Sequence, residues 1–220
     1  MVGRAAVVLS GGQDSTTALW WAIQKFGSEN VFTVTFDYGQ RHRVELECAT
    51  RVAEAAGVPN ILLPIDTFSA IGGNALVDAE LIVAEGRNSD LPTTFVPGRN
   101  LIFLTYVAAW AWPRKIQHLV TGVAQTDYSG YPDCRRETID ALCHALSLGM
   151  DQEFTIHTPL MNLSKKETVL LAESLGALDA MALTHTCYQG ERPPCNECPA
   201  CRLRAKGFEE AGVADPLVLA

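Results

Sequence analysis

The chain has 220 residues, of which 48% are hydrophobic and 19% are charged, a composition typical of a folded globular protein rather than a disordered one. Its net charge of −8 argues against a broad nucleic-acid surface, because affinity for phosphates comes mainly from clustered Lys and Arg, and no apolar run reaches the roughly 18 residues of a membrane span. Seven cysteines crowded towards one end do not form a secreted disulfide pattern, so we expect a soluble cytoplasmic protein with no nucleic-acid or membrane partner.

Short apolar runs that end at glycine, proline or polar residues alternate with segments whose apolar residues recur at helical spacing. In chain order, this pattern predicts strand 5–9, helix 14–26, strand 31–36, helix 45–56, strand 61–65, helix 103–112, strand 119–123, helix 137–148, strand 154–157 and helix 165–175. Ser164 is expected to cap the last helix and Gly176 to end it. The alternation predicts an α/β fold with a doubly wound, mostly parallel sheet, whose ligand crevice lies beyond the carboxyl ends of the strands.

Two stretches show no regular period. Residues 70–100 contain six glycines or prolines, and a loop of that length is usually functional or mobile. Residues 186–201 contain four of the seven cysteines, which we interpret as a small metal-bound appendage. We therefore expect a nucleotide-binding and catalytic domain over 1–180 and a C-terminal metal-binding segment over 181–220 that packs on it.

The residues that join the first predicted strand to the first predicted helix read Ser-Gly-Gly-Gln-Asp-Ser, at positions 10–15. Glycines let the backbone approach a phosphate closely, and the unpaired N–H groups and dipole at a helix start attract an anion. Ser10 and Ser15 can add hydrogen bonds, and Asp14 can hold a magnesium ion that bridges phosphates. The simpler alternative is a tight turn in which Asp14 or Ser15 caps the helix. The chain has no Gly-Lys-Ser/Thr and no G-x-G-x-x-G motif, which argues against γ-phosphate transfer and dinucleotide redox chemistry.

This loop resembles the signature of the PP-loop ATP pyrophosphatase superfamily, and nearly the full chain resembles one of its families, the QueC family of 7-cyano-7-deazaguanine synthases. The resemblance is carried by segments 8–19 (VLSGGQDSTTAL), 35–43 (TFDYGQRHR), 95–100 (FVPGRN), 121–135 (TGVAQTDYSGYPDCR) and 158–161 (TPLM), by Lys165 and Glu167, and by the cysteines near the C-terminus. It implies an adenine nucleotide α-hydrolase-like fold, in which the loop holds the pyrophosphate of ATP while the α-phosphorus is attacked.

The QueC resemblance implies a ligase that forms C–N bonds. Such an enzyme converts 7-carboxy-7-deazaguanine and ammonia to 7-cyano-7-deazaguanine (preQ0), a step of queuosine biosynthesis, through adenylated intermediates that release AMP and pyrophosphate. ATP with Mg²⁺ is the implied cosubstrate. Free ammonia is the expected nitrogen donor because no glutaminase motif is recognisable, and we expect a homodimer.

The resemblance and the loop chemistry together suggest which residues act. The expected ATP contacts are Leu9, Ser10, Gly11, Gly12, Gln13, Asp14, Ser15, Thr16, Thr17, Ala18 and Leu19. The expected catalytic residues are Ser10, Asp14, Arg99 and Lys165. Arg99 and Lys165 can neutralise phosphate or carboxylate charge, although either alone would be interpreted as a solvated surface charge.

The candidates for deazapurine binding are Gln40, Asp127, Tyr131 and Asp133. A carboxylate suits the donor-rich edge of a deazapurine and a tyrosine suits its flat face. A Gly-Pro turn at residues 130–132 is an equal alternative interpretation of the segment that holds the last three.

Cys187, Cys195, Cys198 and Cys201 are separated by seven, two and two residues. Two-residue gaps let successive thiolates converge on one ion, and four thiolates complete a tetrahedral zinc site with no open position. A C-x-x-C-x-x-C pattern also serves iron–sulfur clusters, and reduced cysteines without a metal are the remaining alternative. The QueC resemblance favours one structural zinc ion per chain.

Two other functions fit parts of the sequence. Another PP-loop enzyme would modify tRNA, but the net charge of −8 and the lack of a recognisable RNA-binding extension argue against it. A non-catalytic zinc module that binds a protein or nucleic acid would leave the phosphate loop unexplained.

Overall fold

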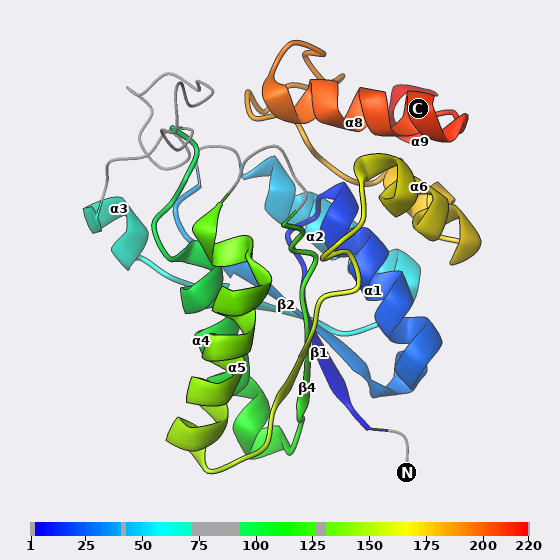
Figure 1. Cartoon of the computed structure of the whole chain (residues 1–220). Coiled ribbons are helices and arrows are strands. Elements are labelled where there is room, and N and C mark those ends of the chain that lie inside the picture. The colour runs from blue at the N-terminus through cyan, green and yellow to red at the C-terminus, as the bar shows by residue number, and fades with distance from the viewer. Residues whose placement is uncertain (1–2, 41–42, 72–92, 126–130, 220) are drawn as a thin grey trace.

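The computed structural model describes residues 3–40, 43–71, 93–125 and 131–219, which form three layers around one parallel sheet (Figure 1). The strands are β1 (Ala5–Val8), β2 (Val31–Asp37), β3 (Asn60–Pro64), β4 (His118–Val120) and β5 (Thr155–His157). They lie in the order β3-β2-β1-β4-β5, and every neighbouring pair is parallel. The predicted doubly wound parallel sheet is confirmed, although β4 ends at Val120 rather than at the predicted residue 123.

Helices cover both faces of this sheet (Figure 1). They are α1 (Gln13–Phe26), α2 (Val44–Ala56), α3 (Thr67–Ile71), α4 (Arg99–Ala111), α5 (Arg136–Met150), α6 (Lys165–Ser174), α7 (Leu178–Met181), α8 (Pro199–Ala211) and α9 (Pro216–Leu219), with 3₁₀ turns at Ser28–Asn30, Trp112–Arg114 and Pro132–Cys134. Side chains of β1 alternate between two cores: Val7 packs with Leu19 under α1 and α2, whereas Ala6 packs with Leu104 under α4 and α5. Burial on both faces explains why the strands read as continuous apolar runs. Within the described ranges, no helix is long and apolar enough to cross a membrane.

The strand order places a ligand crevice at the carboxyl end of β1. The chain proceeds from β1 outwards to β3 and then returns to place β4 against the other side of β1. Loops that leave β1 and β4 therefore diverge, and in open α/β sheets this is where ligands bind. Residues 10–12, which leave β1, lie at this point, as does Gly122, which follows β4.

Helix α4 begins at Arg99, four residues before the start predicted at residue 103. Its N-terminus is satisfied from another segment, because the Asp133 carboxylate accepts a hydrogen bond from the backbone N–H of Asn100 at 3.0 Å. A cap supplied by a residue 33 positions away cannot be recognised from local sequence, so the predicted start was wrong. Arg99 is thereby held in the first turn of the helix.

The C-terminal segment contains α8, a helix that the sequence did not predict because it has few apolar residues and a glycine in its interior. α8 packs closely on α6, since a Cβ on Gly207 would lie 2.9 Å from the Cβ of Lys165. The buried Arg204 donates to both carboxylate oxygens of Asp215, at 2.6 and 2.8 Å, and to Thr184 Oγ1 at 2.7 Å. These contacts join the last part of the chain to the segment that precedes the cysteines.

Candidate active site

The turn between β1 and α1 leaves the start of the helix open. Gly12 is the N-cap residue and has no side chain that could cap the helix, so the alternative of an Asp14 or Ser15 cap was wrong. The Gly12 N–H itself donates to Ser10 Oγ at 3.4 Å. Gly11 has a φ of 81°, and a Cβ there would lie 2.7 Å from the backbone nitrogen of Ala49, so only glycine fits. N–H groups without a side-chain cap at a helix start are suited to an anion, and binding of phosphate here stays a prediction.

The residues expected to contact ATP fall into two groups. Ser10 is exposed, and its Oγ lies 3.0 Å from Ser15 Oγ, so the two hydroxyls shape the loop at the crevice. In contrast, Thr16 and Thr17 are fully buried and donate to the carbonyl oxygens of Gly12 and Gln13 at 2.9 and 3.0 Å. Leu9, Ala18 and Leu19 lie in the core. Contact between ATP and the side chains of this second group stays a prediction.

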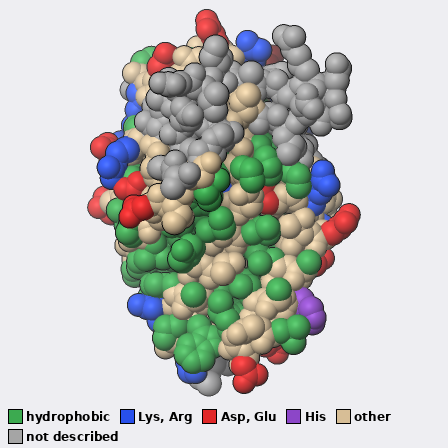
Figure 2. Space-filling view, turned by 90° about the vertical axis from the view of Figure 1, so that its left-hand side faces the viewer, with side chains coloured by type: hydrophobic (Ala, Val, Ile, Leu, Met, Phe, Trp, Pro, Cys, Tyr) green, Lys and Arg blue, Asp and Glu red, His purple; other side chains and the backbone are tan. Residues whose placement is uncertain are grey.

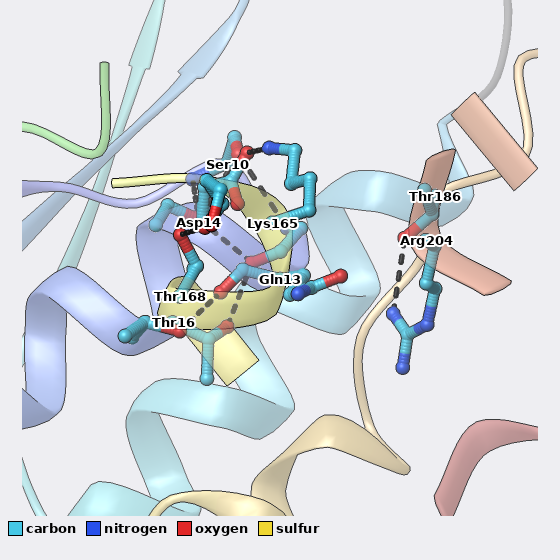
Figure 3. A network of polar contacts seen from close by, with 12 residues as sticks. Ser10, Gln13, Asp14, Thr16, Lys165, Thr168, Thr186 and Arg204 are labelled. Carbon is cyan, nitrogen blue, oxygen red and sulfur yellow. Dashed lines mark hydrogen bonds and ion pairs between the residues drawn. The ribbon is translucent and has the colours of Figure 1, made fainter. Parts of the chain in front are cut away.

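Asp14 and Lys165 form an ion pair at the mouth of the loop (Figure 3). Lys165 Nζ lies 2.7 Å from Asp14 Oδ2, and only 13% of the Lys165 side chain is exposed. Lys165 opens α6, which has the predicted Ser164 cap and a reciprocal hydrogen bond from the Ser164 N–H to Glu167 at 2.7 Å. The other Asp14 oxygen, Oδ1, is buried and accepts no hydrogen bond from the described residues. One oxygen is thus paired with a cation, and the other is available for a ligand.

The loop also depends on a close approach by the residue after β4. A Cβ on Gly122 would lie 2.8–2.9 Å from the backbone of Asp14 and Ser15, so Gly122→Ala must displace the phosphate loop. We expect this substitution to lower the free energy of unfolding by about 1–3 kcal/mol and to weaken ATP binding at least tenfold, by about 1.4 kcal/mol or more. Chemical denaturation and equilibrium ATP binding measure the two effects.

Gly149→Ala is the matched control for this prediction. Gly149 lies inside α5, and a Cβ there meets no atom within 4 Å, so alanine should stabilise the helix by about 0.5–1 kcal/mol and leave ATP binding unchanged. Native stability and affinity in Gly122→Ala would show that the loop does not need this approach.

A second group of polar side chains surrounds Arg99. Its Nη1 lies 3.4 Å from Tyr38 Oη, and Tyr131 and Tyr188 lie within electrostatic range. Burial raises the pKa of Tyr38 to about 12 and also raises the pKa of Tyr188, so both phenols are neutral at physiological pH. In the described part of the chain, Arg99 forms no ion pair with a carboxylate. A guanidinium among neutral phenols is suited to an anionic ligand.

The residues predicted to bind a deazapurine occupy different positions. Tyr131 lies beside Arg99, and its Oη is 2.6 Å from Thr94 Oγ1. Gln40 is buried and bonds through its amide to the backbone of Phe36 and Tyr38, which fixes the turn after β2. Asp133 caps α4 as described above, and Asp127 lies outside the described residues. Direct contact of Gln40, Asp127, Tyr131 and Asp133 with substrate stays a prediction.

Three residues of the Arg99 crevice were missed by the sequence analysis: Tyr38, Glu45 and Tyr188. Tyr38 lies in segment 35–43, which carried the family resemblance, and that was the signal that could have identified it. Glu45 lies on α2, and Tyr188 directly follows Cys187 in the C-terminal segment. Only the tertiary structure brings these two residues together near Arg99.

The four predicted cysteine ligands converge. The Sγ atoms of Cys187, Cys195, Cys198 and Cys201 all lie within 4.8 Å of one another. Four sulfurs around one zinc ion at about 2.3 Å would be about 3.8 Å apart, so the cluster fits a tetrahedral ion with little adjustment. The backbone N–H groups of Glu197 and Cys198 donate to Cys195 Sγ at 3.4 and 3.3 Å, which stabilises a thiolate there. The predicted metal cluster is confirmed as a group of side chains.

A short backbone link joins this cluster to the phosphate loop. The N–H of His185 donates to the carbonyl oxygen of Gly11 at 2.9 Å, and His185 Nε2 lies 2.8 Å from the carbonyl oxygen of Cys187. Cys187, the first of the four cysteines in the cluster, follows His185 by two residues. The geometry of the cysteine cluster and that of the phosphate loop are therefore coupled.

Comparison with known proteins gives consistent matches over nearly the whole chain. The family model described as "Queuosine biosynthesis protein QueC" matches residues 4–212. The 7-cyano-7-deazaguanine synthase of Chromobacterium violaceum is 65% identical over 98% of this chain and 93% of that protein. The protein of the same name from Bacillus subtilis is 50% identical over 94% of each chain.

Among solved structures, a protein described as a predicted subunit of tRNA methyltransferase from Methanocaldococcus jannaschii superposes with a TM-score of 0.51. The match covers 78% of this chain and 74% of that one, at 18% sequence identity. At this identity the similarity supports the fold and nothing more.

Proposed function

Since the chain belongs to the QueC family of queuosine biosynthesis proteins, we propose that it catalyses the ATP-dependent synthesis of 7-cyano-7-deazaguanine from 7-carboxy-7-deazaguanine and ammonia. The observation that carries this proposal is the identity of 65% over 98% of the chain to a protein named for that reaction. The phosphate loop would bind the nucleotide, and Arg99 with the polar side chains around it would bind a second anion.

The reaction must make a carboxylate carbon reactive towards ammonia. A carboxylate is a poor electrophile because its oxygen leaves poorly, and transfer of AMP to that oxygen provides a good leaving group. Residues 10–12 and the first turn of α1 would bind the pyrophosphate of ATP, with Lys165 next to Asp14 adding positive charge. Arg99 would bind the carboxylate of the deazapurine and aim it at the α-phosphorus.

We propose that Asp14 holds the magnesium ion that accompanies ATP. Its Oδ1 is buried without a hydrogen bond from the described residues, and carboxylate oxygens are the ligands that Mg²⁺ prefers. The ion, when bound, neutralises phosphate charge. The Lys165 ion pair fixes the orientation of the carboxylate so that Oδ1 faces outward from the pair.

We propose that the cysteine cluster holds one structural zinc ion per chain. Four sulfur ligands leave no open position for a substrate, so the ion would cross-link the segment after α7 and not take part in the reaction. The hydrogen bond from His185 to Gly11 would then fix the phosphate loop to this cross-link.

We propose a cytoplasmic homodimer that acts on small molecules alone, without a nucleic-acid partner. In support of a dimer, hydrophobic side chains gather on the face shown in Figure 2, and Tyr106, Trp112 and Leu62 are each between 43 and 52% exposed. The net charge of −8 supports the absence of a nucleic-acid partner. The cytoplasm supplies ATP, which the reaction requires.

The products of ATP test the proposed reaction. We expect AMP and pyrophosphate in proportion to nitrile when the protein is incubated with the deazapurine acid, ATP and ammonia, with products identified by mass spectrometry. ADP and inorganic phosphate as the primary products would contradict the assignment, because they require attack at the γ-phosphorus.

The number of ATP molecules used tests whether one site performs two adenylations. Attack of ammonia on the first adenylate gives a primary amide, which must lose water to become a nitrile, and a second transfer of AMP to the amide oxygen makes that loss feasible. We therefore expect two ATP per nitrile from the acid and one from the synthetic amide without added ammonia. An inert amide, or a single ATP from the acid, would show that this course is wrong.

A further inference from the structure

The group of polar side chains around Arg99 includes a carboxylate that the reaction described so far does not use. Glu45 is the second residue of α2, and its backbone packs against Gly11 of the phosphate loop. Tyr38, Arg99 and Tyr188 all lie within electrostatic range of its carboxylate. Four separate segments of the chain therefore converge on this point.

No described residue hydrogen-bonds to the Glu45 carboxylate or forms an ion pair with it at 4 Å or less. The Glu45 side chain is only partly exposed, so its carboxylate has lost part of its hydration and gains no donor from the described residues in return. In the structure Arg99 donates to Tyr38 and Tyr131 bonds to Thr94, so neither side chain is directed at Glu45. A ligand with two adjacent hydrogen-bond donors would satisfy this carboxylate.

The proposed substrate has donors in the required arrangement. The pyrimidine edge of a 7-deazaguanine presents N1–H and the 2-amino group side by side, which is the pattern that one carboxylate accepts with its two oxygens. The adjacent edge presents O6 and the 7-carboxylate, which are acceptors suited to a guanidinium, as in guanine recognition by Arg. The crevice offers one carboxylate, one guanidinium and tyrosine rings for the flat face of the base.

We propose that Glu45 is the residue that recognises the guanine edge of the substrate. Its carboxylate accepts hydrogen bonds from N1–H and the 2-amino group, while Arg99 binds the edge with O6 and the 7-carboxylate. The inference rests on the proposed function and adds the residue that selects a 2-amino-substituted base over other deazapurines.

The ionisation of Glu45 makes this recognition dependent on pH. Burial raises the pKa of Glu45 from 4.5 to about 7, and Arg99 on α4 opposes that rise. The other titratable groups that face it are Tyr38 after β2 and Tyr188 in the C-terminal segment, both neutral, and Cys48 on α2 itself. Above pH 7 the free carboxylate is ionised and accepts both donors. Below pH 7 the carboxyl group is protonated, and its O–H then faces the N–H donors of the base. One hydrogen bond is lost, so recognition of the base weakens as the pH falls.

Glu45→Gln tests the proposal, with Glu47→Gln as the matched control. Both residues lie in the first turn of α2, but Glu47 is exposed to solvent. We expect Glu45→Gln to raise KM for 7-carboxy-7-deazaguanine by about 10–100-fold, since a bidentate contact to a base edge contributes about 1–3 kcal/mol, with KM for ATP unchanged. Glu47→Gln should behave as the native protein does.

The 2-desamino analogue of the acid shows whether Glu45 reads the amino group. The native protein should have a higher kcat/KM for the acid than for the analogue. In Glu45→Gln the ratio of the two kcat/KM values should approach one. In the native protein the same ratio should also approach one as the pH falls through about 7. Both compounds carry the same 7-carboxylate, so the ratio is insensitive to other groups that titrate.

Each outcome decides one question. A native KM and a native preference in Glu45→Gln, or a lower kcat with KM and preference unchanged, would overturn the recognition role. If Glu45→Gln does not fold, the pH dependence of the preference in the native protein decides, and a preference that is constant from pH 6 to 8 overturns the proposal. Failure of the native protein to convert the acid at all would instead contradict the proposed function.

Discussion

Asp14→Asn is expected to lower kcat by about 10²–10³-fold while the protein remains folded. The asparagine keeps the size of the side chain but removes the charge that pairs with Lys165 at 2.7 Å and the anionic Oδ1 that would hold magnesium. Both interactions act on phosphate charge during the reaction, and the Asp14 side chain is 31% exposed, so the core is unaffected. Steady-state turnover measures the loss, and circular dichroism with thermal unfolding confirms the fold.

Asp140→Asn is the control for this substitution. Asp140 forms an exposed ion pair with Arg136 at 3.7 Å on α5, a contact worth less than about 1 kcal/mol, and it makes no hydrogen bond to Asp14 or Lys165. Turnover should be native. Retention of more than a tenth of native turnover by Asp14→Asn would contradict the assigned role of Asp14.

Cys198→Ala is expected to lose bound zinc, stability and turnover together. Native protein should contain about one zinc ion per chain, and removal of one of four thiolates should abolish tight binding, because metal binding and local folding are coupled with apparent energies of about 10–16 kcal/mol in small zinc sites. Turnover should fall because His185, two residues before Cys187, is hydrogen-bonded to Gly11 in the phosphate loop. Elemental analysis and thermal unfolding measure the first two effects.

Cys143→Ala separates loss of zinc from loss of a thiol. The Cys143 Sγ lies 3.3 Å from the carbonyl oxygen of Phe154 and outside the cluster, so this variant should keep zinc and turnover. Native zinc content in Cys198→Ala would exclude it as a ligand. A brown preparation that contains iron would assign the four cysteines to an iron–sulfur cluster instead.

The parts of the fold that could be predicted from sequence are those that local chemistry determines. The inner strands β1 and β2 are short runs that are largely buried on both faces. The loop at residues 10–15 and the cysteine spacing are compact local patterns that the sequence shows directly. The start predicted for α4 was wrong because the carboxylate that caps this helix, that of Asp133, comes from another segment of the chain. Helix α8 was missed because its stability comes from close packing on α6 and from the buried Arg204 and not from apolar periodicity.

The site was predictable only in part for the same reason. Asp14 and Lys165 were expected to act on the same anions. Their ion pair depends on the tertiary structure and could not be predicted from the sequence. Glu45 gave no signal, since a glutamate near a helix start reads as an exposed residue, and only the fold encloses it with Arg99 and Tyr188. The sequence suggested that Gln40 binds substrate. In the structure the Gln40 side chain instead forms hydrogen bonds with the backbone of its own turn.

The ion pair between Asp14 and Lys165 joins residues 151 positions apart, and this separation has a consequence for protein synthesis. At about 5–20 residues per second, a ribosome adds Lys165 roughly 8–30 s after Asp14. By the end of that interval the chain contains the glycine loop and the residues of all five strands, but neither the lysine nor His185, which hydrogen-bonds to the loop. If the loop binds ATP as proposed, we expect nucleotide to stabilise the protein by binding only when synthesis is nearly complete.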